Sequence, residues 1–160
     1  MKEKVLNVSF DSLPDVRVRV INNDDVKDLI ESKKKYPFEI HNSVSVKVIT
    51  TKRQFYFMIF NGYTWNGADI PRFCWRLVGS RTDNDFLIAS MIHDYILEFK
   101  TYIKKEVLKE ELSTKEYRRL TSLIFRQKLK DAEVGTIKAN IMSYCVDVFQ
   151  MFNFKGWQND

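Results

Sequence analysis

Residues 44–60, with the sequence VSVKVITTKRQFYFMIF, carry the clearest strand pattern in the chain. The first half alternates valine with polar residues, which is the period-two signal of a β-strand. The run Gln54–Phe60 is apolar at almost every position, so we expect a strand that is buried on both faces. The polar break Thr50–Arg53 between the two runs predicts an antiparallel hairpin.

The residues before this hairpin continue the strand pattern. Alternating apolar and polar residues at Val5–Phe10 and at Val16–Val20 predict two more strands. The segment Asn22–Lys35 is the exception, because its apolar residues recur at helical spacing behind Asp24 and Asp25. This segment predicts a short surface helix.

After residue 62 the apolar period becomes helical. We expect one helix from Asp83 or Asn84 to at least Leu97, and a second that opens at Ser113 or Thr114, where Glu116 completes a capping box. A third, long helix carries the apolar stripe Val134, Ile137, Ile141, Tyr144, Cys145, Val148 and Phe152. The order predicts an α+β fold, with an antiparallel sheet from the N-terminal third and three main helices packed on one face.

Size and composition fit a single packed domain. The chain has 160 residues, and a domain usually has roughly 100–200, so we expect one domain over 1–160, with strands mostly in 1–61 and a loop plus helices in 62–160. Two cysteines, Cys74 and Cys145, are too few for a disulfide scaffold, and we expect reduced, buried thiols. The chain shows neither a signal-peptide pattern nor an apolar run long enough to span a membrane, which predicts cytoplasmic synthesis.

The net charge of +5 is concentrated in one stretch. Residues 100–130 hold ten basic and four acidic side chains. Because Glu106, Glu110, Glu111 and Glu116 interrupt the bases, we interpret Lys100–Lys130 as a solvated helical face. A patch that binds phosphate or a partner is the alternative, so nucleic acid is a partner that we consider but do not favour.

The densest turn signal is GYTWNGADIP, residues 62–71. Gly67 can adopt positive φ and so present Asn66 and Asp69 from a tight turn, and Pro71 suits the first turn of a helix. Asn66 and Asp69 are candidate site residues. The alternative is that both side chains only satisfy nearby backbone donors.

The second candidate is the run His93-Asp94-Tyr95. His93 lies on the apolar stripe of its predicted helix, so its ring should point inward. A buried imidazole can act as acid, base or metal ligand, although a core histidine with satisfied hydrogen bonds is the commoner case. The only other histidine, His41, stands in no motif, and a zinc site usually needs three protein ligands. Nucleophile-elbow, phosphate-loop, dinucleotide and HExxH patterns are absent from the sequence.

Together, GYTWNGADIPRF, ASMIHDYI and YRRLTSLIF resemble a family of small phage and prophage proteins classed as a domain of unknown function. The resemblance covers roughly Phe55–Trp157. The family pattern has an Asp-Gly-Ala-Ser-x-Pro loop, an HDxxY-like helix and a later Arg-x-x-Ala-Asp-x-x-Phe helix. The positions that match it are Gly67, Ala68, Ile70, Pro71, His93, Asp94, Tyr95, Arg118 and Phe125.

The chain departs from this pattern at three places. Asn66 replaces the usual Asp, Asp69 replaces Ser, and Thr121-Ser122 replaces Ala-Asp. A family site that bound a metal or moved a proton would therefore be rearranged or degenerate here. The resemblance implies phage or prophage origin, and hence a bacterial host with the virion as a later destination, but it implies no reaction.

Two functions remain open. We favour a non-catalytic virion component or accessory protein that binds a phage or host protein, with His93, Asp69 and Arg118 in a buried polar cluster and Asn66, Arg118, Tyr95 and Ser122 as binding residues. The alternative is a small hydrolase-like enzyme that uses His93 with Asp94 and Asp69, assisted or not by a divalent metal. Both predict that the Asn66–Asp69 turn lies within hydrogen-bond reach of His93, Asp94 or Arg118.

Overall fold

The computed structural model describes residues 2–67, 84–132 and 135–153, and it confirms the α+β fold. The strands are β1 (Val5–Phe10), β2 (Val16–Val18), β3 (Phe38–Ile40), β4 (Val44–Thr50), β5 (Gln54–Ile59) and β6 (Thr64–Trp65). The helices are α1 (Lys27–Lys35), α3 (Asn84–Glu98), α4 (Lys100–Tyr102), the π-helix η1 (Ile103–Leu108), α5 (Thr114–Asp131) and α6 (Thr136–Asn153). Instead of one sheet, the strands form two three-stranded antiparallel sheets, ordered β1-β4-β5 and β2-β3-β6.

The sheet β1-β4-β5 has one buried face. Strands β4 and β5 form the predicted hairpin, and β4 alternates strictly between buried and half-buried residues. The expectation that β5 is buried on both faces is wrong, because its residues alternate between exposed and buried. Tyr56 and Met58 point to the outer face, where they remain 50% and 41% exposed. Apolar residues can occupy such an outer face, so an apolar run does not by itself show two-sided burial.

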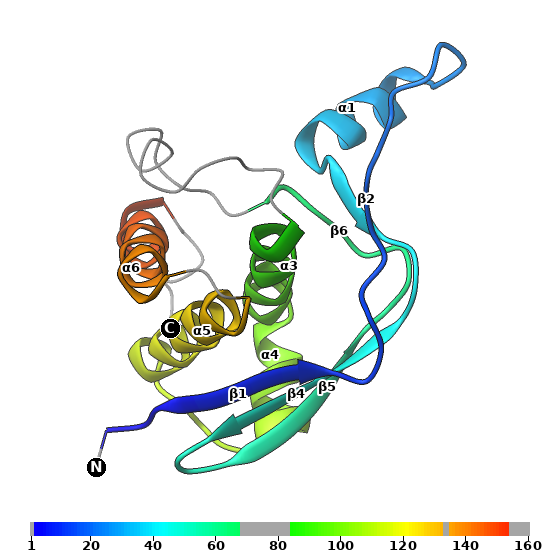
Figure 1. Ribbon diagram of the computed structural model, residues 1–160. Helices are drawn as coiled ribbons and strands as arrows, with labels where there is room; N and C mark the ends of the chain where they lie inside the picture. The colour runs from blue at the N-terminus through cyan, green and yellow to red at the C-terminus, as the bar shows by residue number, and fades with distance from the viewer. Residues whose placement is uncertain (1, 68–83, 133–134, 154–160) are drawn as a thin grey trace.

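The second sheet connects the hairpin to the loop that contains the candidate site. Strand β6 pairs with β3, and the Gly62 amide donates a hydrogen bond to the Ile40 carbonyl oxygen at 2.8 Å. Helix α1 follows β2 and contains no buried residue, as expected for a surface helix. Figure 1 shows α1 projecting at the end of this sheet, away from α5 and α6.

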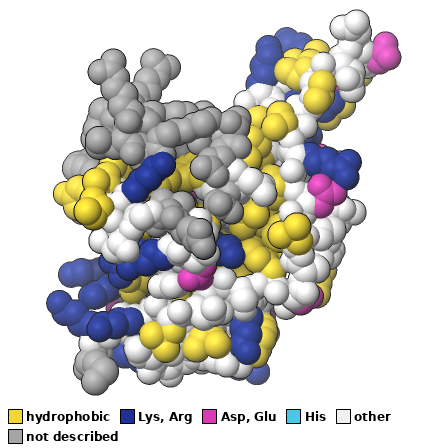
Figure 2. Space-filling model, in the orientation of Figure 1, with side chains coloured by type: hydrophobic (Ala, Val, Ile, Leu, Met, Phe, Trp, Pro, Cys, Tyr) yellow, Lys and Arg dark blue, Asp and Glu magenta, His cyan; other side chains and the backbone are white. Residues whose placement is uncertain are grey.

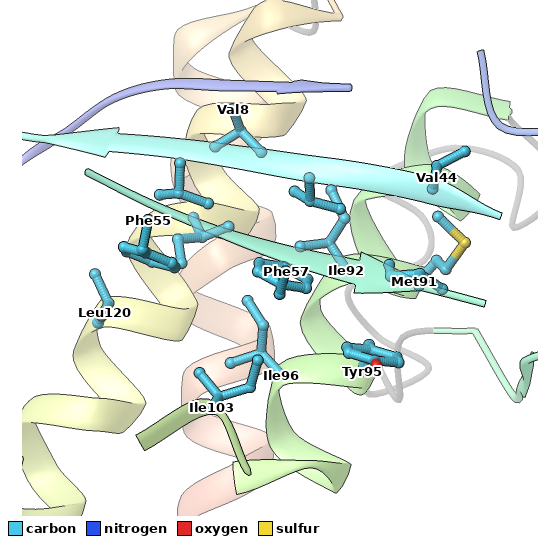
Figure 3. Close-up of a cluster of buried hydrophobic side chains, with 14 of the residues drawn as sticks. Val8, Val44, Phe55, Phe57, Met91, Ile92, Tyr95, Ile96, Ile103 and Leu120 are labelled. Atoms are coloured by element: carbon cyan, nitrogen blue, oxygen red, sulfur yellow. The ribbon is translucent and has the colours of Figure 1, made fainter. Parts of the chain in front are cut away.

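Helices α3, α5 and α6 gather on one side of the sheet β1-β4-β5 (Figure 1). Helix α3 buries more residues than the single apolar stripe predicted, because every residue from Phe86 to His93 is buried. Figure 3 shows side chains of β4 and β5, among them Val44, Phe55 and Phe57, directed toward α3 and toward Leu120 of α5. Helix α5 begins at the predicted capping box of Ser113 and Glu116. Because one hydrophobic cluster includes residues from both halves of the chain, we propose that they form one domain.

Helix α6 departs in part from its predicted apolar stripe. Cys145 is buried as expected, and the side chains of Val134, Val148 and Phe152 lie outside the described residues. Ile137, Ile141 and Tyr144, expected in the core, are 78%, 37% and 70% exposed. Among the side chains of α6 that the structure describes, the buried ones are Ala139, Met142, Ser143, Cys145 and Val146. The buried face of α6 packs with Phe125 and Leu129 of α5, and it combines the small Ala139 with the larger Met142 and Val146.

Two further expectations have an outcome in the described residues. Cys145 is disulfide-bonded, so the expectation of a reduced thiol is wrong for this residue, and Cys74 lies outside the described ranges. Among the helices of the described residues, none combines the length and apolar character needed to cross a membrane.

Gly67 and Gly62 offer a matched test of how the loop leaves the second sheet. Both have positive φ, +78° at Gly67 and +85° at Gly62, but only at Gly67 would a Cβ meet another side chain, 3.1 Å from Phe38 Cε2. An L side chain in the left-handed region costs about 1–2 kcal/mol. We expect Gly62→Ala to lower the free energy of unfolding by about that amount, and Gly67→Ala to lower it further, because the buried Phe38 must move. Equal denaturant midpoints for the two variants would contradict this packing.

Candidate functional site

The strand before the turn is fastened to helix α3 by a buried hydrogen bond. Trp65 Nε1 donates to Ser90 Oγ at 3.1 Å, and Ser90 Oγ donates to the Leu87 carbonyl oxygen at 2.9 Å. Trp65 and Ser90 are both almost fully buried. Because a buried N–H without a partner is costly, this bond holds β6 at one position along α3. The turn that follows, beginning at Asn66, therefore starts beside α3.

A second contact between β6 and α3 involves Tyr63. Its hydroxyl donates to Glu98 Oε2 at 3.1 Å, and its ring meets Tyr95 edge-on with centroids 5.1 Å apart. Burial, and then the charges of Asp94 and Glu98, raise the pKa of Tyr63 above its ordinary value. Asp94 and Glu98 stand four residues apart on α3, which places them on one face of the helix. Tyr63, Asp94 and Glu98 therefore make the junction acidic.

His93 points into the protein, as its helical position predicts. Its residue is only 2% exposed, and its ring packs edge-on against Phe125 of α5 at a centroid distance of 5.4 Å. His93 Nδ1 lies 3.1 Å from Asp94 Oδ1. Asp94 thus joins the buried imidazole on one side to the acidic junction with Tyr63 on the other. A carboxylate that orients an imidazole in this way is compatible with general base chemistry and also with a purely structural ion pair.

Arg118 and Ser122 belong to a second polar group, between α5 and α6. Arg118 Nε lies 3.1 Å from Asp147 Oδ1, and Ser122 Oγ donates to the same oxygen at 3.3 Å. The Arg118 Nε–H is buried and lacks hydrogen-bond geometry toward a partner among the described residues, so we treat this contact as an ion pair. Asp147 therefore supplies, from the next helix, a carboxylate beside Ser122, where the sequence suggested that one had been lost.

The structure brings the predicted residues together in part. His93 and Asp94 are in contact, and Arg118 and Ser122 share Asp147. Tyr95 belongs to the core instead, stacked on Phe57 at 5.8 Å. Asp69 lies outside the described residues, so its place in the cluster and the contact of the Asn66–Asp69 turn with His93, Asp94 or Arg118 stay predictions.

Sequence reasoning missed four residues that build these groups, namely Tyr63, Ser90, Glu98 and Asp147. Glu98 stands four residues after Asp94, a spacing that places both on one helix face, so it could have been found. Asp147 has no such signal, because its partners come from another helix. Within the ranges that the structure describes, no group of three or more His, Cys, Asp or Glu side chains is placed to hold a metal ion.

The predicted contact between turn and helix can be measured by a double-mutant cycle. His93→Ala should lower the free energy of unfolding by about 1–3 kcal/mol, because it removes a buried partner of other polar groups. Combined with Asn66→Ala, the two losses should be non-additive by about 0.5–3 kcal/mol, as expected for residues in one network. Chemical denaturation of the four proteins gives this coupling.

His41 provides the matched control for this cycle. Its side chain is 40% exposed, and its nearest carboxylate is Glu39, with His41 Nε2 3.9 Å from Glu39 Oε2. His41→Ala should change the unfolding free energy little and show no coupling to Asn66→Ala. Strict additivity of Asn66 with His93 would show that turn and helix form no composite site.

Comparison with known proteins places the chain in a family. The family model described as "Protein of unknown function (DUF1353)" matches residues 42–146, which run from just before β4 into α6. Comparisons with curated proteins and with solved structures find no match. The match covers well over half of the sequence and includes both polar groups described above, apart from Asp147 at its edge. The chain belongs to the DUF1353 family of proteins of unknown function.

Proposed function

We propose that this chain is a phage- or prophage-encoded, non-catalytic protein that binds a phage or host protein through the face formed by α5 and α6. The similarity of GYTWNGADIP and HDYI to the phage and prophage pattern supports the origin. Under this proposal the protein is made in the cytoplasm of a bacterial host and acts there as an accessory factor or is carried into the virion.

The observation that carries the proposal is the apolar stripe on α6. Ile137, Ile141 and Tyr144 are exposed and stand at positions i, i+4 and i+7, so they line one face of the helix. Single exposed apolar residues are common on protein surfaces. Three exposed apolar side chains on the same face of one helix are typical of a surface that another protein covers.

A positively charged cleft adjoins the stripe. It measures about 420 Å³ and lies between α5 and α6. Lys115, Arg118, Arg119 and Arg126 line its α5 side, and Tyr144 and Asp147 lie on the α6 side. Figure 2 shows Lys and Arg side chains gathered where α5 lies, with hydrophobic side chains beside them over α6. This combination suits a partner segment that carries apolar anchors flanked by carboxylates.

The polar groups of the candidate site support a structural role. His93 is buried between Asp94 and Phe125, and Arg118 is paired with Asp147. Buried polar groups that are paired in this way fix the positions of helices without taking part in a reaction. We propose that Asp69 completes this cluster.

One observation favours the enzymatic alternative, a hydrolase-like site. The 3.1 Å contact between His93 Nδ1 and Asp94 Oδ1 is the arrangement by which a carboxylate orients a general base. In that function Asp69 would be the second carboxylate and Arg118 would bind an anionic group of the substrate.

Site-specific photo-crosslinking tests the partner proposal. A photoreactive phenylalanine analogue is placed at Tyr144 or, as the matched control, at Tyr56, a 50% exposed tyrosine on β5. During phage growth or prophage induction we expect one discrete protein adduct at Tyr144 and none of that mass at Tyr56. Arg119→Glu with Arg126→Glu should abolish the adduct. These two arginines are chosen because Arg118 is paired with Asp147.

The affinity of the purified partner gives the quantitative result. Tyr144→Glu should weaken binding at least tenfold, and Tyr56→Glu should leave it unchanged, since only the first places a charge in the apolar stripe. Identical adducts at both positions, or equal affinities for the two variants, would overturn the proposal that α5 and α6 form the binding face.

A further inference from the structure

Five lysines from successive elements line one surface hollow, which we call the lysine hollow. Lys100 comes from α4, Lys104 and Lys105 from η1, Lys109 from the turn after η1, and Lys115 from the first turn of α5. The hollow measures about 1330 Å³. These lysines belong to the basic stretch that the sequence suggested to be a solvated face. In the structure these five lysines instead line the same hollow.

The backbone reaches this arrangement through two uncommon conformations. Helix η1 is a π-helix of six residues, an element that is rare and often found at functional sites. It ends at Lys109, whose φ of 54° and ψ of 34° lie in the left-handed region, and the Lys109 N–H donates to the Lys104 carbonyl oxygen. A non-glycine residue is strained in this region. Lysine therefore occupies a backbone position where glycine would be less strained.

The charges around the hollow favour an anionic ligand with several negative groups. The five ammonium groups share the hollow with two carboxylates, those of Glu110 and Glu111. Glu110 is already bound to a cation outside the hollow, because its Oε2 lies 2.5 Å from Arg53 Nη1. Lysines on flexible stems act as point charges, which suits a row of phosphates better than one planar group.

Exposed aromatic rings next to the lysine hollow indicate which polyanion fits. Phe99 and Tyr102 are 39% and 45% exposed and line an adjoining hollow of about 480 Å³, together with the carboxylates Glu98 and Glu106 at its edge. The two hollows share Lys100 and Lys105. Lysines that follow a phosphate backbone, combined with aromatic rings on which bases stack, are the features of single-strand nucleic-acid binding.

From this juxtaposition we propose that the lysine hollow and the Phe99–Tyr102 surface bind single-stranded nucleic acid without sequence preference. The phosphates would contact the lysines, and one or two bases would stack on the exposed rings. The lysine hollow shares Lys115 with the cleft between α5 and α6. The variants below change neither Lys115 nor a residue of the α6 stripe, so either proposal can fail without the other.

Fluorescence anisotropy with a labelled 15-nucleotide oligothymidine tests the proposal on the full chain. Binding should saturate and weaken with NaCl, with a slope of log affinity against log salt of about −2 to −3.5 for three to five phosphate contacts. Lys104→Ala with Lys105→Ala and Lys109→Ala should weaken binding at least tenfold. The matched control, Lys27→Ala with Lys34→Ala and Lys35→Ala on α1, removes the same charge and should have less than a threefold effect.

Single variants at Lys109 and Tyr102 separate a binding defect from a folding defect. Lys109→Gly relieves the left-handed backbone strain, so it should raise the melting temperature. It should also weaken binding and reduce the magnitude of the salt slope by the amount that corresponds to about one phosphate contact. Tyr102→Ala should weaken binding about fivefold or more, and Tyr102→Phe should retain it, because stacking needs the ring alone. Poly-glutamate should compete poorly with the oligonucleotide.

Three results would overturn the proposal. The first is an equal loss of affinity in the α1 control variant, which would indicate a general charge effect. The second is unchanged binding by Tyr102→Ala together with effective competition by poly-glutamate, which would assign the hollow to acidic polypeptides. The third is an affinity weaker than millimolar at 50 mM NaCl, which would leave the lysines as a solvated face.

Discussion

Helix α3 is buried on nearly every side, and the other elements take their positions from it. The sheet β1-β4-β5 covers one side with Phe57, which stacks on Tyr95, and α5 covers another with Phe125, which packs against His93. At a third side the hydrogen bond from Trp65 to Ser90 fastens β6 to the helix. Because Ser90 is buried, displacement of β6 would leave an indole N–H or a hydroxyl without a partner, which is costly in the core.

The polar groups follow from this arrangement. Asp94 and Glu98 stand on the side of α3 that meets Tyr63, while His93 points toward α5 and touches Phe125. With its core side packed on α3 and the sheet, α5 can meet α6 along another face and open its basic residues to solvent. The helix therefore connects the acidic junction at β6 with the basic surfaces of α5.

The sequence predicted β1, β2, β4 and β5, the hairpin, the helix start at Ser113 and the inward direction of His93, because local periods and caps determine these features. It gave no range for the short strands β3 and β6. The sequence did not predict correctly which apolar residues of β5 and α6 remain exposed. An apolar period shows that one face is hydrophobic, but contact with the neighbouring helix decides which face is buried, and α6 buries Ala139 and Ser143 instead of Ile137. The pairing of Ser122 with Asp147 and the convergence of lysines at η1 depend on tertiary and π-helical geometry, which no local pattern encodes.

Native-state hydrogen exchange tests the central place of α3 most directly. If the other elements depend on this helix, the amides of Ile88–Ile96 should exchange only through global unfolding, with an opening free energy equal to that from chemical denaturation. Helix α1, which buries no residue, and helix α6, which leaves Ile137 and Tyr144 exposed, should open at lower free energy. Amides of α3 that exchange as readily as those of α1 or α6 would contradict the account.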